Sequence, residues 1–377
     1  YVEQVSYSFT EMTTNQKKKV INHRLPPGML AMLVLMVLAI LGVGFWFYAT
    51  QEQQHREIRE NQLLAIAQLK VDQITRWREE RMADASSLVK SPLFAEAVSE
   101  WLISSDAELE EKILARLGIV QKYYHYQDIL LVDGNGKVLL SLNNTVDRLH
   151  EIALAELPTA VRERKAVFVD FHSAPGEHKP HLDVMAPLFT QQKGSPQAAG
   201  ALVLCIDPSQ YLYPLIQSWP IPSKTAETLL VSRQDDQVLF LNELLYQKDA
   251  ALKLRIPLSQ TDVPAVMVIL GKEGIVEGRD YRGAAVLAAL KKIPDSPWFI
   301  IAKMDAEEAF SAMRFNTALI LSLIIGLLLI AAVIGTLLWQ GRQRMVYQAL
   351  YRAEVERQAL LRHFEYLVKY ANDIIIL

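Results

Sequence analysis

Five polar side chains of the types that bind ligands or metal ions lie close together in one stretch of the sequence. They are Asp170, His172, His178, His181 and Asp183. They fall on two expected strands and on the connection between them. Imidazole and carboxylate groups can hydrogen-bond a small molecule, and the same groups can coordinate a divalent metal ion. Solvated loop and edge-strand residues would give the same pattern.

The two functional interpretations of this stretch differ in the geometry that they require. A metal site would combine His178 and His181 with Asp170 or Asp183, across a Pro-Gly connection that fixes no coordination geometry. A ligand pocket at the strand ends needs only one or two of these groups. We therefore predict ligand binding by Asp170, His172, His181 and Asp183, with no metal ion and no cofactor.

Two residues of an expected long helix are further candidates. Trp77 and Arg81 are four residues apart and so lie on one helix face, from which they could line the same cavity. Tryptophan at helical spacing is more often a core residue, and arginine more often covers a surface. Tyr281 and Arg282 fall in an expected turn, where we predict a structural use.

The composition excludes several classes of function. The net charge of −3 gives no basic field for nucleic acid. Cys205 is the only cysteine, so the sequence has no intrachain disulfide and no cysteine-based metal cage, and its apolar surroundings predict a small buried side chain. No Gly-x-Ser-x-Gly, His-Glu-x-x-His or phosphate-loop motif occurs. The sequence therefore predicts no catalytic site within the chain.

Two uninterrupted apolar runs predict two transmembrane helices. Residues 28–49 contain only apolar, glycine and aromatic side chains, and about 22 residues span roughly 30 Å of hydrocarbon. Residues 317–339 form a second run of similar length. A cleaved signal peptide is the alternative for the first run, but its apolar core would be shorter and a small-residue cleavage site would follow.

The basic residues orient these helices. Lysines and an arginine precede the first run, arginines follow the second, and positive charge stays on the cytoplasmic side. We therefore expect a cytoplasmic tail at 1–27, a region outside the cytoplasm at 50–314, and contact with membrane lipid. Met12 is a candidate start, so no function is expected for residues 1–11.

The outer region shows an α+β pattern in two modules. Apolar residues at three- and four-residue steps from Leu63 to Leu88 predict a long stalk helix, which Ser91-Pro92 interrupts. Helical sequence and about five strands follow, in a distal module at about 90–218. A second set of strands, among them Ala265–Leu270, predicts a membrane-proximal module at about 223–305.

The outer region resembles the double-Cache sensor domain of bacterial transmembrane receptors. Its stretches that carry the resemblance are Trp77-Arg78, Asp128 to Ser141, Gly200 to Asp207, Asp280 to Gly283 and Pro297 to Asp305. The resemblance implies a long stalk helix with two PAS-like mixed helix and antiparallel-sheet modules, a small-molecule ligand in the distal module, and a place in the bacterial inner membrane with the sensor in the periplasm. The arginine and Trp-Tyr pair by which that family holds the carboxylate of amino acids is not found before Asp170.

The segment after the second apolar run predicts a signalling helix. Residues 340–362 carry a heptad pattern that favours a parallel coiled coil and hence a homodimer, although a single amphipathic helix would give a similar pattern. Residues 363–377 resemble the opening helix and first strand of a PAS domain.

The sequence thus favours a sensory receptor with its output domain beyond residue 377. In the resembled family this output is commonly a histidine kinase, and the alternatives are the regulatory half of a diguanylate cyclase or phosphodiesterase, or an envelope module that binds protein or polysaccharide. Whether the whole protein is an enzyme is left open by these residues.

Overall fold

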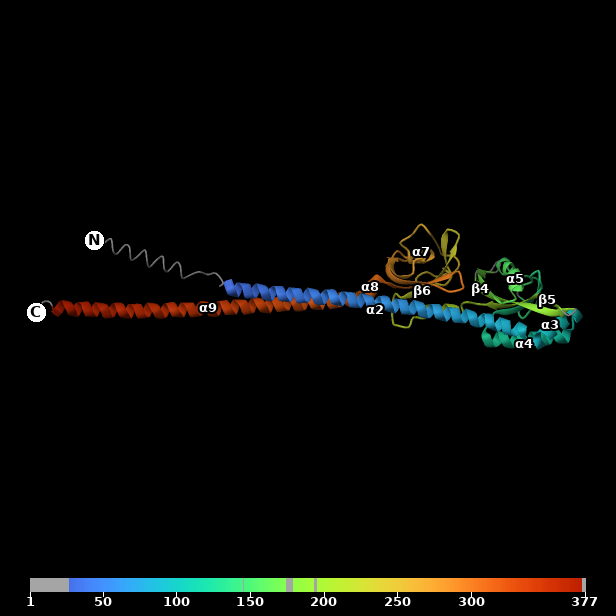
Figure 1. Cartoon of the computed structure of the whole chain (residues 1–377), viewed down its shortest axis with the longest axis horizontal. Coiled ribbons are helices and arrows are strands. Elements are labelled where there is room, and N and C mark those ends of the chain that lie inside the picture. Colours follow the sequence, from blue (N-terminus) through green and yellow to red (C-terminus); the bar gives the residue numbers. More distant parts are fainter. Residues whose placement is uncertain (1–26, 145, 174–178, 193–194, 375–377) are drawn as a thin grey trace. The chain divides into compact units, whose positions relative to one another are not determined.

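The chain divides into two compact units. The computed structural model describes residues 27–144, 146–173, 179–192 and 195–374 (Figure 1). One unit contains the described residues up to Gln54 and those from Met313 onward, and the other contains His55–Ala312. The expected tail before residue 27, His178 and the last three residues of the expected PAS start lie outside the described residues.

Both apolar runs lie in long helices. Helix α2 (Pro27–Lys90) contains the candidate span Leu30–Thr50, and α9 (Ser311–Ile374) contains a second that begins at Thr317. Their mean hydropathies are 2.6 and 3.0, and only 6% and 11% of the two apolar windows are buried within the molecule. By length and composition, both helices are long and apolar enough to cross a membrane. The expected PAS start is helical as far as Ile374.

Glycines mark the contact of the two apolar helices in the first unit. A Cβ atom on Gly44 would lie 2.5 Å from Ile324 Cδ1, and one on Gly335 would lie 3.3 Å from Leu33 Cδ1. Small residues at such points let helix backbones approach closely.

The distal module is a five-stranded antiparallel sheet with helices on both faces. The strand order is β2-β1-β5-β4-β3. The strands are β1 (Asp128–Val132), β2 (Val138–Ser141), β3 (Val167–Ser173), β4 (Pro180–Gln192) and β5 (Ser195–Ile206). Side chains of α2, α3 (Pro92–Ser104) and α4 (Ala107–Tyr124) pack on one face, and α5 (Glu151–Glu163) covers the other. Alternation along β4 divides the faces, because Leu182 and Val184 pack with the stalk and Met185 packs with α5.

The proximal module is a six-stranded antiparallel sheet in the order β8-β7-β6-β11-β10-β9. The strands are β6 (Glu227–Gln234), β7 (Gln237–Phe240), β8 (Arg255–Pro257), β9 (Gly274–Arg279), β10 (Ala285–Lys292) and β11 (Trp298–Asp305). The helices are α6 (Leu212–Gln217), which joins the modules, α7 (Pro264–Ile269), and α8 (Ala306–Ala309), which leads into α9.

The prediction of a strand at Ala265–Leu270 was wrong, since these residues form α7 and its C-cap. Pro264 occupies the first turn of this helix, where its missing N–H costs nothing. A short, wholly apolar run has no period that separates a buried strand from a buried helix.

The two modules share one core along α2. Trp298, the first residue of β11, is 1% exposed and packs with distal residues such as Phe171 and with Trp77 of the stalk in a single cluster. Figure 1 shows both modules following each other along α2. Because this core is continuous, a displacement of the distal sheet meets proximal side chains directly.

Gly200 fixes the path of β5 across the distal sheet, and its replacement tests this packing. Its φ is +139°, and a Cβ atom there would lie 1.8 Å from the carbonyl oxygen of Val132. We expect Gly200→Ala to lower the free energy of unfolding by about 2–4 kcal/mol, because the strand must move away from β1. Chemical denaturation of the whole chain in detergent measures this loss.

The matched control is Gly271→Ala. Gly271 also has positive φ, at +90°, but nothing lies within 4 Å of the added Cβ atom. That variant should lose only about 1–2 kcal/mol of backbone strain. Equal losses at the two positions would contradict the close approach of β5 to β1.

Candidate ligand-binding site

A row of three residues crosses the central strands of the distal sheet on its α5 face. In the register of the sheet, Asp128 of β1 lies opposite Cys205 of β5, and Cys205 lies opposite Asp183 of β4. His172 and His181, a cross-strand pair of β3 and β4, lie next to this row, and His150 precedes α5. We call these six residues the distal polar cluster. It brings together three predicted site residues, His172, His181 and Asp183.

His172 and Asp183 form a buried ion pair. The His172 Nε2 atom lies 3.2 Å from Asp183 Oδ2, and the side chains are 6% and 7% exposed. The other ring nitrogen, Nδ1, lies 3.0 Å from the backbone oxygen of Asp170. With an acceptor at each nitrogen, the doubly protonated ring satisfies both contacts. Burial lowers the pKa of His172, but the hydrogen bond and charge of Asp183 outweigh it, so that the pKa is raised.

The two other histidines differ in their surroundings. His150 stacks on His172 with ring centroids 5.1 Å apart, and burial together with the charge of His172 lowers its pKa. His181 lies with Nδ1 2.8 Å from Gln127 Oε1. The cluster thus contains two stacked imidazoles that differ in protonation: their surroundings favour the charged form of His172 and the neutral form of His150.

Cys205 forms the floor of the cluster between the two carboxylates. The thiol is enclosed by protein, although the residue as a whole keeps part of its surface accessible. Burial and the facing charges of Asp183 and Asp128 raise its pKa well above the usual range, so the thiol stays neutral. Asp128 itself accepts hydrogen bonds from Ser141 Oγ at 2.7 Å and from the amide of Leu142 at 3.1 Å.

Three predicted site residues lie elsewhere. A β-bulge between Val169 and His172 redirects Asp170, whose Oδ1 accepts a hydrogen bond from Trp298 Nε1 at 2.7 Å. Trp77 is 4% exposed in the stalk-side core and stacks with Tyr211.

Arg81 also belongs to the stalk side. Its guanidinium pairs with Asp84 at 3.1 Å and covers the rings of Tyr124 and Tyr126. Through these contacts Arg81 packs α2 against the C-terminal end of α4 and the residues that follow it.

The proximal module carries a counterpart at the same place in its sheet. There Glu227 of β6 lies opposite Lys303 of β11, which lies opposite Ala288 of β10. The two sheets therefore match strand by strand, with Glu227 at the position of Asp128 and Lys303 at the position of Cys205. Sequence reasoning missed this equivalence, because the paired residues are far apart in the chain.

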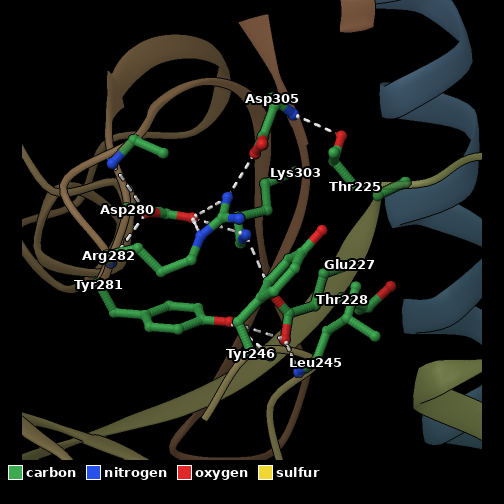
Figure 2. Close-up of polar contacts among 12 residues, drawn as sticks. Thr225, Glu227, Thr228, Leu245, Tyr246, Asp280, Tyr281, Arg282, Lys303 and Asp305 are labelled. Carbon is green, nitrogen blue, oxygen red and sulfur yellow. Dashed lines mark hydrogen bonds and ion pairs between the residues drawn. The ribbon is translucent and has the colours of Figure 1, made fainter.

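Lys303 is the centre of an ion network that we call the proximal ion cluster. Figure 2 shows its members: Glu227, Asp280, Arg282, Lys303 and Asp305. The ammonium of Lys303 is 0% exposed and lies 2.9 Å from Glu227 Oε2 and 2.8 Å from Asp280 Oδ2. Arg282 pairs with Asp280 at 2.7 Å and also with Asp305, which precedes α8. Burial raises the pKa of Asp280, but hydrogen bonds from Arg282 and Lys303 outweigh it and hold the pKa below its usual value.

Comparison with known proteins finds similarity in solved structures alone. No family model and no curated protein matches the chain. Similar solved structures include the ligand-binding domain of Mlp24 with asparagine, at 16% identity and a TM-score of 0.47 over 69% of this chain and 99% of that one. The Campylobacter jejuni chemoreceptor Tlp3 domain with L-norvaline has 13% identity and a TM-score of 0.49 over 68% and 94%.

A third similar structure is the Pseudomonas aeruginosa amino acid chemoreceptor PctB domain with L-Arg. It has 16% identity and a TM-score of 0.45, over 67% of this chain and 97% of that one. At these identities and TM-scores, the ligand of this chain has to be argued from its own residues.

The raised pKa of His172 predicts a pH-dependent stability. A group whose pKa is higher in the folded state stabilises the fold fully below its unfolded pKa of about 6.5, and this contribution is lost as the pH rises through the folded value. We expect the thermal midpoint of the wild type to fall relative to that of His172→Gln as the pH rises above about 6.5. His150 affects stability in a different pH range. Its pKa is lowered in the folded state, so its effect on stability changes only below its usual pKa.

Thermal unfolding of both proteins between about pH 6 and pH 9 measures this difference. Groups that titrate equally in the two proteins do not contribute to the difference between their thermal midpoints. A difference in midpoint that stays constant with pH would contradict a charged His172–Asp183 pair.

Loss of the Lys303 ammonium leaves two buried carboxylates without their shared cation. We expect Lys303→Met to lower the free energy of unfolding by about 3–5 kcal/mol, because removing one partner of a buried ion network leaves the other charges uncompensated. Chemical denaturation measures this loss. Lys292 is an exposed lysine of β10, and Lys292→Met is the matched control. A cost for Lys303→Met no larger than the control's would refute the network's role in stability.

Proposed function

We propose that this chain is the sensory part of a transmembrane receptor, in which the region at 50–314 lies outside the cytoplasm and binds a small molecule. The distal polar cluster carries this proposal. It combines buried charged and titratable side chains with a short, partly accessible Cys205 between two carboxylates. Burying charged groups costs folding free energy unless they are paired. Clusters of titratable groups with shifted pKa values are therefore common at functional sites.

The counterpart in the proximal module suggests the chemistry of the ligand. Lys303 fills its position with a long side chain that ends in an ammonium group between carboxylates. The equivalent Cys205 is short, and it too lies between carboxylates, those of Asp128 and Asp183. We therefore propose that a small molecule with a protonated amine occupies the distal cluster, and that the carboxylates of Asp183 and Asp128 hold it.

Binding at this cluster has a short route to the membrane helix. His172 contacts the backbone of Asp170, and Asp170 accepts a hydrogen bond from Trp298 at the start of β11. Strand β11 ends at Asp305 and continues through α8 into α9. A ligand that favours one arrangement of the distal sheet would therefore favour one position of β11.

The output is proposed on the resemblance to the double-Cache family. In that proposal the protein lies in the bacterial inner membrane with both termini cytoplasmic, α9 pairs in a homodimer over residues 340–362, and a PAS domain and a histidine kinase follow. A cyclic-dinucleotide cyclase or phosphodiesterase is the alternative output.

Primary amines test the ligand site. In the whole chain held in lipid nanodiscs, we expect at least one of a panel of small primary amines, such as putrescine or tyramine, to raise the thermal midpoint. The same compound acetylated at every amine should not, because no protonated amine remains. Asp183→Asn should remove the shift, and Glu96→Gln, at an exposed carboxylate of α3, should retain it.

A second test of the amine site needs no ligand and compares two variants of Cys205. In Cys205→Lys, a tethered ammonium would meet Asp128 and Asp183 as Lys303 meets its carboxylates, so we expect it to be more stable than Cys205→Met, which is similarly long and uncharged. An isolated buried cation would instead cost several kcal/mol. A less stable Cys205→Lys, together with no response to any amine, would contradict the amine site and favour an interaction module.

A further inference from the structure

A cavity lies in the region at 50–314, apart from the distal polar cluster. It has a volume of about 130 Å³. It lies between the stalk helix, the segment that follows α6, and the end of the proximal module. The lining residues come from α2, from residues 219–222, and from the junction of β11 with α8 and α9.

The walls of this cavity are about half apolar and half polar, and the apolar part suits a compact ring. Its apolar lining residues include Leu63 and Ile66 of α2 together with Trp219, Ile221 and Met304. An apolar protein cavity of about 150 Å³ is large enough to bind benzene. The space is thus sufficient for one small ring or one branched aliphatic group.

One cation in the wall has most of its hydrogen-bonding capacity unused. Among the described residues, the only hydrogen bond to the Arg59 guanidinium is to Gln62 Oε1, at 3.2 Å. A guanidinium has five N–H donors and keeps its charge. Three residues earlier in the same helix, Arg56 is paired with both Glu60 and Glu277.

The carboxylate in the same wall does not neutralise Arg59. The oxygens of Glu308 already accept hydrogen bonds from Ser223 Oγ, from the amides of Lys224 and Thr225, and from Thr225 Oγ1. These donors surround the Glu308 charge and reduce its repulsion of a second anion. Arg59 is left for a group from outside the chain.

We propose that this cavity is a second ligand site, for a small carboxylic acid with a compact apolar body whose carboxylate pairs with Arg59. The apolar body would fill the space between Ile66, Ile221 and Met304. An occupant would contact α2 and also Ser311, the first residue of α9. Binding here would therefore favour one spacing between the stalk helix and the start of α9, independently of the distal module.

Benzoate and its neutral isostere benzamide test this site on the whole chain in nanodiscs. We expect ¹⁹F NMR of 4-fluorobenzoate to show binding that unlabelled benzoate displaces and that benzamide displaces at least about tenfold less well, because a charged hydrogen-bonded pair is worth that factor. Arg59→Gln should weaken 4-fluorobenzoate binding by a similar factor. Ile221→Trp, at a partly exposed wall residue, should fill the space and abolish binding.

Arg56→Gln is the matched control and should bind within about twofold of the wild type, because Arg56 already has its carboxylates. Asp183→Asn should also leave 4-fluorobenzoate binding unchanged, which separates this site from the distal one. The proposal is overturned by the absence of binding up to about 10 mM, where an affinity is worth less than about 3 kcal/mol. It is also overturned by binding that survives both Arg59→Gln and Ile221→Trp.

Discussion

The indole of Trp298 is the contact on which the arrangement of the two outer modules depends. It belongs to the proximal sheet, but its Nε1 atom donates to Asp170 of the distal sheet at 2.7 Å. Arg78 of the stalk helix lies over the same ring, 5.0 Å from its centroid, and donates to the backbone of Pro294 and Asp295. One side chain therefore joins the stalk and both sheets. Since it is almost wholly buried, none of the three can shift without repacking the others.

The two modules use one sheet plan for opposite purposes. Both begin their first strand with an acidic residue, Asp128 in one and Glu227 in the other, that accepts an amide hydrogen bond from the segment after the second strand. Across from it, the proximal module places a lysine that completes the charge balance from within. The distal module places a cysteine and leaves the balance to a histidine whose charge depends on its surroundings. The first arrangement is complete without a ligand, and under the proposed function the second can respond to one.

Local sequence was sufficient to predict the elements and part of the site. The two long apolar helices and the break at Ser91-Pro92 follow from composition, and the gathering of His172, His181 and Asp183 follows from strands adjacent in the chain. Cys205 was predicted as a buried small side chain, which describes its size but misses its position between two carboxylates. That position depends on the register of β5 against β1 and β4, and no local pattern encodes such pairings.

The remaining differences have the same origin in long-range structure. A single bulge in β3 turns Asp170 away from its neighbours in sequence, toward Trp298. The expected turn at Tyr281 and Arg282 is structural as predicted, but its importance comes from Lys303, more than twenty residues away, through their shared partner Asp280. Both cases show that side-chain type and local spacing identify candidates, while the fold decides which candidates meet.

Under the proposed function, stiffness of the proximal module has a consequence for signalling. If the proximal module were loosely packed, a movement of the distal sheet would be absorbed by local rearrangement of the proximal side chains. The proximal ion cluster opposes this, because each of its buried charges is held by at least two partners and a partial movement would uncover a charge. Strand β11 carries Lys303 within this cluster and Trp298 at its other end, so it should move as a unit. A small change at the distal polar cluster would then reach α9 as a displacement of the whole strand.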